Sequence, residues 1–329
     1  MTDNTLSVEE ISSLINSKIQ EVNLPEEPAK LYDPIRYILS LGGKRLRPLL
    51  AVMSHNLFTD DVSEVILPAI SIEVFHNFTL VHDDIMDEAP LRRGQVTVHK
   101  KWNNNVGILS GDTMLVKAYE LLSLAPNEKL PEILAAFNKT AIGVCEGQQL
   151  DMDFEERSLL ENPVTEIEYM NMIRLKTAVL FGFSLELGGI MGSEDADVSQ
   201  QLYNSGVHLG LAFQLQDDLL DLYGDEKFGK QIGGDILNAK KTYLLVKALE
   251  LATSDKKQEL VGIMTSNTIT DQEMIESVKS LYNYYQIADM AKKQIELHLE
   301  DFRKTIMNID SSRSSKLLDF VNSLANRAV

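Results

Sequence analysis

Cysteine, tryptophan and late prolines are scarce in this chain of 329 residues. Cys145 is the single cysteine, so no internal disulfide can form, which favours a reducing cytoplasm. We interpret Cys145 as a small core residue or a residue near a site, rather than as a nucleophile. All nine prolines lie at or before Pro163, so nothing in the second half of the chain forces a helix to stop.

Net positive charge and membrane-directed segments are missing as well. The formal net charge is -18, which argues against nucleic acid or an anionic membrane as the main partner. The first residues, MTDNTLSVEE, lack the basic start and apolar core of a signal peptide. No uncharged apolar run reaches about 18 residues, so we predict no integral membrane segment.

Apolar residues recur at helical spacing, while strand-like alternation is almost missing. Helical patterns occur between Ile11 and Val22 and between Leu317 and Leu324. The best strand candidate, residues 95–98, is short and follows Gly94, so we expect a loop there. The polar stretch 253–272 is expected to form a helix–turn–helix connection. We therefore predict an all-α protein with a single domain over residues 1–329.

Two segments, residues 66–81 and 203–223, are apolar on nearly every side. A helix without a polar face belongs in the middle of a bundle, so both are predicted to be central helices. Each runs into an acidic cluster of the form D-D-x-x-D, which reads DDIMD at 83–87 and DDLLD at 217–221. On a helix this spacing is expected to aim the three carboxylates of each cluster into one sector.

The two clusters predict a metal site. Like charges at this spacing repel by about 1 kcal/mol in water and by more when partly buried. One cluster could be a solvated helix end, but two with the same spacing indicate a bound divalent cation. Mg2+ takes oxygen ligands and is usually shared between a few carboxylates and substrate phosphates. The residues concerned are Asp83, Asp84, Asp87, Asp217, Asp218 and Asp221.

Fixed positive charge that could hold a diphosphate accompanies the clusters. The stretch GGKRLRP at 42–48 combines a glycine turn with three cations, and Lys176 stands among apolar residues. Arg45 and Lys241 fit ordinary solvated charges better. The aspartates and a diphosphate would leave a negative balance unless metal is bound. The candidate cations are Lys44, Arg47, Arg92, Arg93, Lys176, Lys230 and Lys240.

Taken in order, these motifs resemble those of the trans-isoprenyl diphosphate synthases, the polyprenyl synthetase family that includes farnesyl and geranylgeranyl diphosphate synthases. The resemblance runs from about Asp33 to the last helix. It is carried by GGKRLRP at 42–48, DDIMD at 83–87 with RRG at 92–94, GQQLD at 147–151, KT at 176–177 and FQLQDDLLD at 213–221. It implies the isoprenoid synthase fold, an antiparallel helix bundle around a central cavity, and a homodimer.

The resemblance also implies a Mg2+-dependent head-to-tail condensation of isopentenyl diphosphate with an allylic diphosphate. Three Mg2+ ions per active site would be held by Asp83, Asp87 and Asp217. The rest of the acidic and allylic side would comprise Asp84, Arg92, Lys176, Thr177, Gln214, Asp218, Asp221, Lys230 and Lys240. The isopentenyl diphosphate site would comprise Lys44, Arg47, His76 and Arg93, while Gln148 and Asp151 would line the cavity near the metals.

Spacing agrees with the role implied for His76. It lies seven residues before Asp83, two helical turns away on the same face. A histidine alone on an apolar face is more often a satisfied core residue, but the surrounding motifs favour a substrate site here. His82 has no comparable support.

Product length is expected to depend on Phe78 and Thr79, which lie on the helix that ends at Asp83. Phe78 is five residues before Asp83, about 7.5 Å along the helix, where a large ring could block the growing tail. In the family an aromatic residue here usually marks a short-chain enzyme. Because Thr79 is small, only Phe78 would block the growing tail. We expect a product of fifteen or twenty carbons, with core packing as the other interpretation of Phe78.

Rival interpretations are a longer-chain polyprenyl diphosphate synthase, a class I terpene cyclase and a catalytically silent subunit of a heteromeric synthase. A cyclase would usually carry an N-D-x-x-S-x-x-x-E second metal site in place of the second D-D-x-x-D. A silent subunit is expected to have lost part of its acidic clusters, and both are intact in this chain.

Overall fold

A computed structural model describes residues 6–224, 232–310 and 312–326, so the predicted contact Lys230 lies outside the described residues. The chain divides into two compact units. Unit 1 comprises Met1–Asn138, Phe183–Tyr203 and Ile309–Phe320, and unit 2 comprises Lys139–Gly182, Asn204–Asn308 and Val321–Val329. The prediction of a single domain stays a prediction, and the two units are described separately.

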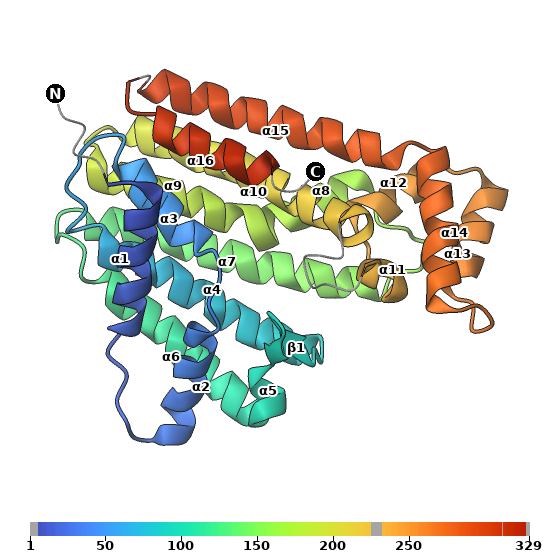
Figure 1. The fold of residues 1–329 in the computed structure, drawn as a ribbon, viewed down its shortest axis with the longest axis horizontal. Helices are drawn as coiled ribbons and strands as arrows, with labels where there is room; N and C mark the ends of the chain where they lie inside the picture. Colours follow the sequence, from blue (N-terminus) through green and yellow to red (C-terminus); the bar gives the residue numbers. More distant parts are fainter. Residues whose placement is uncertain (1–5, 225–231, 311, 327–329) are drawn as a thin grey trace. The chain divides into compact units, whose positions relative to one another are not determined.

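Helices make up nearly all the regular structure of the described residues, which confirms the all-α prediction (Figure 1). Unit 1 contains α1 Val8–Gln20, α2 Ala29–Ser40, α3 Leu46–His55, α4 Ile66–Met86, α5 Val98–Lys101 and α6 Asn104–Leu122. Unit 2 contains α8 Glu166–Ile173, the π-helix η1 Arg174–Ala178, α11 Gly234–Leu237, α12 Tyr243–Leu251, α13 Ser254–Met264 and α14 Asp271–Tyr284. Residues of both units occur in α7 Leu130–Glu155, α9 Val179–Gly192, α10 Ala196–Tyr223, α15 Ile287–Ile309 and α16 Ser315–Asn326.

The apolar helix α4 is the buried centre of unit 1, as its sequence predicts. Nearly all of its residues from Ile66 to Val81 are buried, and α3 and α6 pack along it. Glycines on α6 allow a close approach: a Cβ at Gly111 would lie 2.3 Å from His82 Nε2, and one at Gly107 would lie 2.8 Å from Ile85. The chain therefore fixes the acidic end of α4 against α6.

Residues 91–96 form a β-hairpin, so the prediction of a loop at 95–98 was wrong. Strand β1 Leu91–Arg92 pairs antiparallel with β2 Gln95–Val96, and α5 begins at Val98. The two turn residues, Arg93 and Gly94, have φ values of 52° and 73°. Positive φ at both central residues is the geometry of a type I′ turn, which matches the twist of paired strands. This hairpin carries the adjacent Arg92 and Arg93.

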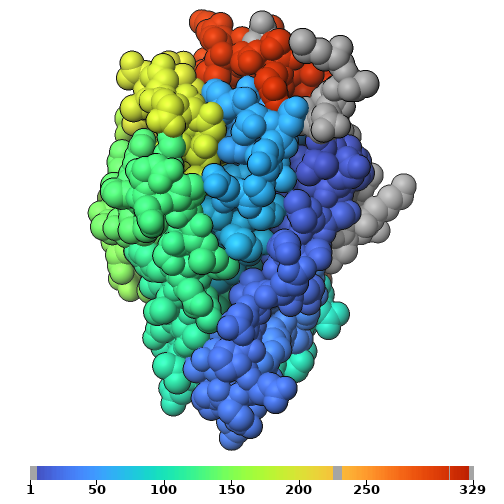
Figure 2. Space-filling model, turned by 90° about the vertical axis from the view of Figure 1, so that its left-hand side faces the viewer, coloured from blue at the N-terminus to red at the C-terminus, as the bar shows by residue number. Residues whose placement is uncertain are grey.

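Distant parts of the sequence meet on one face of unit 1 (Figure 2). Lys129 pairs with Glu194 at 2.7 Å and also donates to Ser193 O at 3.1 Å, which joins the green and yellow segments. Arg313 donates to Asn56 O at 2.9 Å and pairs with Asp60. These ties hold the segment 183–203 to the connection between α6 and α7, and the segment 309–320 to the connection between α3 and α4.

Two side chains differ from their sequence interpretation. Cys145 is exposed on α7, where Val144 and Gly147 take the buried side, so its interpretation as a core residue is wrong and its place near a site stays a prediction. Arg45 is not a solvated charge: it is 5% exposed and its Nη1 lies 2.5 Å from Glu73 Oε1. Both corrections depend on packing that no local pattern reveals.

One continuous helical run, Glu166–Gly192, is long and apolar enough to cross a membrane by length and composition. Two thirds of its most apolar window, 67%, is buried inside the protein, as in a core helix. The sequence prediction of no membrane segment, which rested on the lack of a long uncharged run, therefore did not take this helical run into account. Its burial inside the protein explains why it is so apolar.

Candidate active site

The first acidic cluster occupies the last turn of α4, and its three carboxylates are not equivalent. Asp84 is 1% exposed, and Arg92 Nε donates to its two oxygens at 2.8 and 3.0 Å. Arg92 Nη2 also lies 2.6 Å from Asp84 Oδ1 and 3.6 Å from Asp83 Oδ2. Asp83 is partly buried and Asp87 is exposed. Asp84 is thus the buried member of the cluster, held by Arg92 of the hairpin, and the expectation that the three carboxylates share one sector stays a prediction.

Burial raises the pKa of Asp84, and the hydrogen bond and charge of Arg92 oppose that shift. For Arg92, burial lowers the pKa, but the hydrogen bond and charge of Asp84 raise it more, so the pKa of Arg92 is raised overall. A charge-assisted fork of this kind is stronger and better defined than a neutral hydrogen bond. Arg92 is thereby held beside Asp83, where it can contact an anion bound to the exposed acids.

Three of the four residues predicted to bind isopentenyl diphosphate come together in unit 1. Arg47 Nη1 lies 3.2 Å from His76 Nε2, which joins α3 to α4. Arg93 donates to Gly42 O and packs on Gly43, where an added Cβ would lie 3.1 Å from its guanidinium. Lys44, in the same glycine turn, is exposed. The turn thus presents cations on a backbone that a side chain at Gly43 would obstruct.

His76 is held neutral by its surroundings. Burial and then the charges of Arg47 and Arg93 hold the pKa of His76 well below its usual value. A neutral imidazole can accept at Nε2 the hydrogen bond that Arg47 donates. His76 therefore combines features of both interpretations, since it is partly buried in the protein and holds Arg47 by a hydrogen bond.

The second acidic cluster lies at the end of α10 in unit 2 and has the same unequal arrangement. Asp218 is 5% exposed and accepts hydrogen bonds from Tyr169 Oη, from Tyr243 N at 3.0 Å and from Gln214 Nε2 at 3.0 Å. Thr177 Oγ1 donates in turn to Gln214 Oε1 at 3.0 Å. Asp217 is exposed and Asp221 partly buried. The structure thus connects Thr177, Gln214 and Asp218 in one chain of hydrogen bonds.

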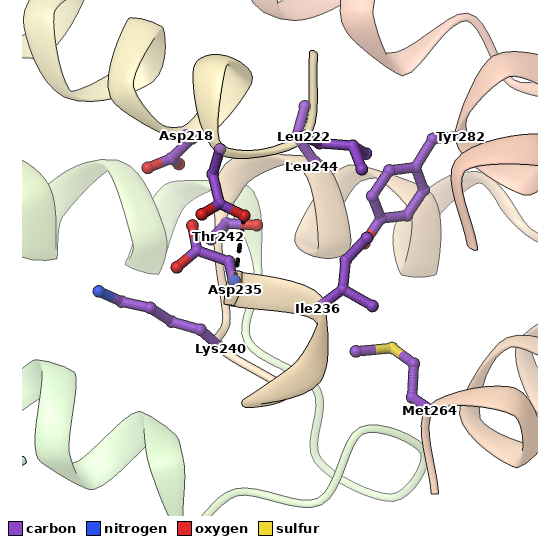
Figure 3. Close-up of a pocket in the computed structure, with 10 residues that line it drawn as sticks. Asp218, Leu222, Asp235, Ile236, Lys240, Thr242, Leu244, Met264 and Tyr282 are labelled. Carbon is purple, nitrogen blue, oxygen red and sulfur yellow. Dashed lines mark hydrogen bonds between the residues drawn. The ribbon is translucent and has the colours of Figure 1, made fainter. Parts of the chain in front are cut away.

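Asp235 is a fourth acid of this cluster that the sequence interpretation missed (Figure 3). Its backbone N donates to Asp221 Oδ2 at 3.0 Å, and Gly233 N donates to Asp221 O at 2.7 Å. Burial raises the pKa of Asp235 to about 7; Lys240 opposes this, and the charges of Asp221 and its neighbours add to it. Asp235 and the predicted contact Lys240 line one small pocket together with Asp218 and Asp221. The only sequence signal was its place in the GGD stretch before Lys240.

Lys176 is presented by the π-helix η1. Its Nζ lies 2.6 Å from Asp151 Oδ2 on α7, so the structure joins two residues that were predicted separately. Gly147, one turn before Asp151, lets the helices touch: a Cβ there would lie 2.2 Å from Lys176 N. Single π-helical turns occur often at functional sites because they redirect side chains within a helix. Gln148, the other predicted cavity residue, lies partly buried next to this contact.

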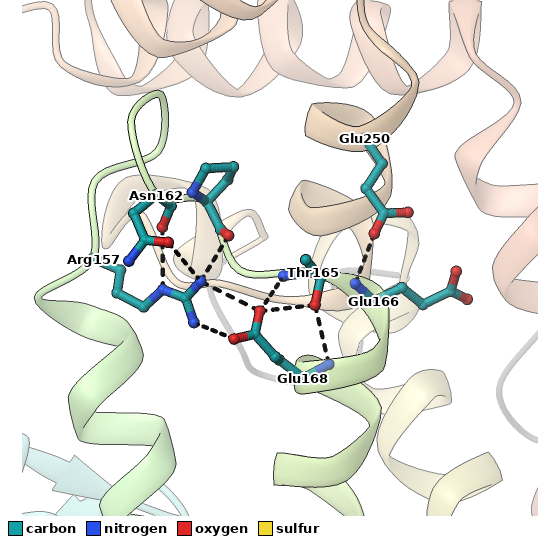
Figure 4. Close-up of polar contacts among 7 residues, drawn as sticks. Arg157, Asn162, Thr165, Glu166, Glu168 and Glu250 are labelled. Carbon is teal, nitrogen blue, oxygen red and sulfur yellow. Dashed lines mark hydrogen bonds and ion pairs between the residues drawn. The ribbon is translucent and has the colours of Figure 1, made fainter.

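The loop between α7 and α8 is fixed by Arg157 (Figure 4). Arg157 Nη1 lies 2.7 Å from Glu168 Oε1, and its Nη2 donates to Pro163 O at 2.8 Å. Glu168 also accepts from Thr165 N at 2.9 Å, so it closes a capping box on α8. The hydrogen bond from Arg157 lowers the pKa of Glu168 to about 2. Lys241, expected to be a solvated charge, donates to Glu155 O at the end of α7 at 2.8 Å.

The carboxylates suit a metal that leaves positions open for substrate. Among residues 6–224, 232–310 and 312–326, no group of three or more acids, histidines or cysteines lies close enough to enclose an ion. Mg2+ binds in this open way, through one or two carboxylates, several waters and phosphate oxygens. Asp83 and Asp87 of unit 1 and Asp217 of unit 2 are each exposed or only partly buried, so each is accessible as a ligand of this open kind.

The family model for polyprenyl synthetase matches residues 28–285, which includes every motif described above. The chain belongs to the polyprenyl synthetase family. It is a trans-isoprenyl diphosphate synthase, a prenyltransferase that builds short-chain prenyl diphosphates by condensation.

Relatives and solved structures cover almost the whole prenyltransferase. The geranylgeranyl pyrophosphate synthase of Geoglobus acetivorans is 38% identical over 94% of this chain and 95% of its own. A crystal structure of a geranylgeranyl pyrophosphate synthase, 42% identical, superimposes with a TM-score of 0.92 over 99% of this chain and 100% of that one. A more distant structure, polyprenyl synthase from Caulobacter crescentus CB15, is 26% identical with a TM-score of 0.81 over 96% and 97% of the two chains. It is complexed with calcium and isoprenyl diphosphate.

Proposed function

We propose that this prenyltransferase condenses isopentenyl diphosphate with allylic diphosphates head to tail and releases a twenty-carbon product, geranylgeranyl diphosphate. The observation that carries the proposal is the pairing of two D-D-x-x-D clusters with a separate cationic turn, which provides for two diphosphates. Relatives of 38–42% identity named as geranylgeranyl pyrophosphate synthases support the twenty-carbon choice. A cyclase would have no use for the second diphosphate site at Arg47, His76 and Arg93.

Asp83, Asp87 and Asp217 would hold Mg2+, three ions per site, and bound Mg2+ supplies charge that favours departure of the allylic diphosphate. The chain's own cations act in the same direction: Arg92, Lys176 and Lys240 stabilise negative charge as the allylic C–O bond breaks. The binding of calcium and isoprenyl diphosphate by the Caulobacter crescentus synthase supports a divalent ion here.

The allylic cation must meet only the double bond of isopentenyl diphosphate. Lys44, Arg47 and Arg93 bind that diphosphate, and the neutral His76 keeps Arg47 aimed at it. Apolar walls exclude water that would quench the cation. The hydroxyl of Thr177 and the amide of Gln214 direct their oxygen dipoles toward it, and the departing diphosphate takes the proton that is lost.

The test is incubation of the pure chain with Mg2+, isopentenyl diphosphate and each of dimethylallyl, geranyl and farnesyl diphosphate. Chromatography of the dephosphorylated products should show a twenty-carbon alcohol from every primer. Absence of diphosphate release would refute the catalytic assignment and favour a silent subunit. A hydrocarbon product would identify a cyclase, and products beyond twenty carbons would identify a longer-chain synthase.

The synthase also acts as a cytoplasmic homodimer in this proposal. Helix α6 carries an exposed apolar stripe at helical spacing, with Ile108 45%, Leu109 58% and Val116 65% exposed. A contiguous apolar face of this kind marks a protein contact. Val116→Asp should convert the dimer to a monomer in sedimentation analysis, because an aspartate would be buried unpaired at the contact. The control Glu276→Ala, an exposed residue of α14, should stay dimeric; a dimeric Val116→Asp protein would place the contact elsewhere.

A further inference from the structure

Glu73 is a buried carboxylate in the middle of α4 that no motif of the sequence singles out. It is 2% exposed and lies three residues before His76. Its Oε1 accepts hydrogen bonds from Arg45 Nη1 at 2.5 Å and from Asn77 Nδ2 at 2.9 Å. A buried carboxylate costs several kcal/mol unless it is paired and hydrogen-bonded, as it is here.

The pair fixes the backbone that leads into α3. Arg45 has φ 47° and ψ 42°, the left-handed region that costs a non-glycine residue about 1–2 kcal/mol. Its Nη2 donates to Leu39 O at 2.5 Å, so the guanidinium ties the end of α2 and the start of α3 to Glu73. Such a conformation persists only where the surroundings determine it strongly.

The backbone held in this way is the cationic turn itself. Lys44 precedes Arg45, and Arg47 follows it and contacts His76. Arg93 leans on the same turn through Gly42 O and the face of Gly43. Glu73 therefore lies under a group of cations that would repel one another before any diphosphate arrives.

Electrostatics point the same way. Burial lowers the pKa of Arg47 to about 10, and Glu73 is the charge that opposes this shift most. Burial also lowers the pKa of Arg93, and Glu73 again opposes it most, while Arg45 and Arg92 add to the lowering. A buried ion pair can often be replaced by apolar residues without loss of stability, so stability alone does not account for Glu73.

We propose that Glu73 is a positioning residue for isopentenyl diphosphate: it substitutes for the absent diphosphate charge and keeps the turn at Arg45, and hence Arg47 and Arg93, in the binding arrangement. This inference rests on the proposed function, since it takes Arg47 and Arg93 to be isopentenyl diphosphate contacts. It assigns Glu73 no contact with substrate.

The test separates the charge of Glu73 from its shape. Glu73→Gln retains an acceptor for Arg45 but loses the charge. We expect its KM for isopentenyl diphosphate to rise about tenfold, while the KM for the allylic substrate changes less than about twofold. The alkaline limb of kcat/KM for isopentenyl diphosphate should move to lower pH by roughly one unit, because Arg47 loses a proton more easily without the carboxylate.

Three further variants keep the test decisive. Glu73→Asp retains the charge and should keep the alkaline limb near its wild-type position. Arg45→Met with Glu73→Leu removes both charges without leaving one unpaired, and it replaces Glu73→Gln if that protein is unstable. Asp60→Asn, at the Arg313 pair of the same unit, is the matched control and should leave both KM values unchanged.

The results distinguish failure of the inference from failure of the proposed function. An alkaline limb that does not move in Glu73→Gln, with equal changes in both KM values, would show a merely structural role and overturn the inference. Arg47→Gln provides the second measurement. If Arg47→Gln leaves the KM for isopentenyl diphosphate unchanged, the proposed substrate site is wrong and the inference about Glu73 is wrong with it. If Arg47→Gln raises that KM and Glu73→Gln does not, only the role of Glu73 is refuted.

Discussion

Replacing Phe78 with alanine should lengthen the product, because its ring lies along α4 from the acids where chain growth starts. Phe78 is five residues before Asp83, about 7.5 Å along the helix. The ring is 9% exposed and contacts Phe75 at 5.5 Å and His82 at 4.9 Å between centroids. These contacts hold it rigidly enough to stop a growing tail.

The next ring sets the size of the effect. Phe75 lies three residues further from the acids, about 4.5 Å along the helix, which is roughly the advance of one isoprene unit. Phe75 is backed by Phe137 at 5.1 Å, and Phe137 by Phe183 at 5.5 Å. The main product of Phe78→Ala should therefore grow by five carbons and stop, whereas Phe75→Ala with Phe78→Ala should extend it further.

Product chains are measured by chromatography of the dephosphorylated alcohols, with farnesyl diphosphate as primer. Truncating a buried phenylalanine costs about 3–5 kcal/mol, so a control for lost packing is needed. Phe302→Ala removes an equally buried ring from α15 and should lower Tm without changing product length. A folded, active Phe78→Ala enzyme with the wild-type product would show that Phe78 is not the floor; equal lengthening in Phe302→Ala would show general loosening.

Two further predictions follow from the second acidic cluster and its supports. Gly147→Ala should lower both Tm and kcat, because the added Cβ would lie 2.2 Å from Lys176 N. The control Gly262→Ala has open space around its Cβ and should raise the free energy of unfolding by about 0.5–1 kcal/mol. Similar Tm values for the two variants would contradict the packing argument. Asp235→Asn should stabilise the metal-free enzyme relative to wild type, and increasingly so as pH rises from about 4 to 7. In the wild type, the unfolded chain loses the Asp235 proton near the usual pKa of 3.8, whereas the folded protein keeps it until about pH 7. Folding of the wild type therefore becomes less favourable across that window, and the variant avoids this loss. A Tm difference between variant and wild type that is the same at both ends of the window would refute this assignment.

Elements with strong local signals could be predicted from the sequence, and those that depend on distant residues could not. The apolar pattern of residues 66–81 is sufficient to predict α4, and the helix–turn–helix predicted at 253–272 is confirmed by α13, the turn after it and the start of α14. The hairpin at 91–96 escaped because it depends on positive φ at Arg93, a residue that rarely adopts it. The π-helix at Lys176 depends on Gly147, which lies on another helix.

Site residues divide in the same way. Acids that repeat at a fixed spacing, together with nearby cations, can be recognised in the sequence, because the repulsion between like charges has to be offset by a bound ion or a partner. Tyr169 and the backbone of Tyr243 do not, although both hold Asp218. Their roles arise only when α8, α10 and the start of α12 meet, and tyrosines in apolar helices are ordinary core residues in most proteins.

The unequal aspartates explain why the motif has three acids when a metal needs fewer. In each D-D-x-x-D the middle acid is the buried one, 1% exposed at Asp84 and 5% at Asp218. On a helix the second acid lies about 100° around the axis from the first and about 60° from the last, so it stands at the edge of the sector that the other two share. Asp84 is braced by Arg92, and Asp218 by hydrogen bonds from Tyr169 on α8 and from Tyr243 N on α12. The middle acid thus ties the end of each helix to its supports, which would keep the outer acids in place for the metal and diphosphate that we propose they bind.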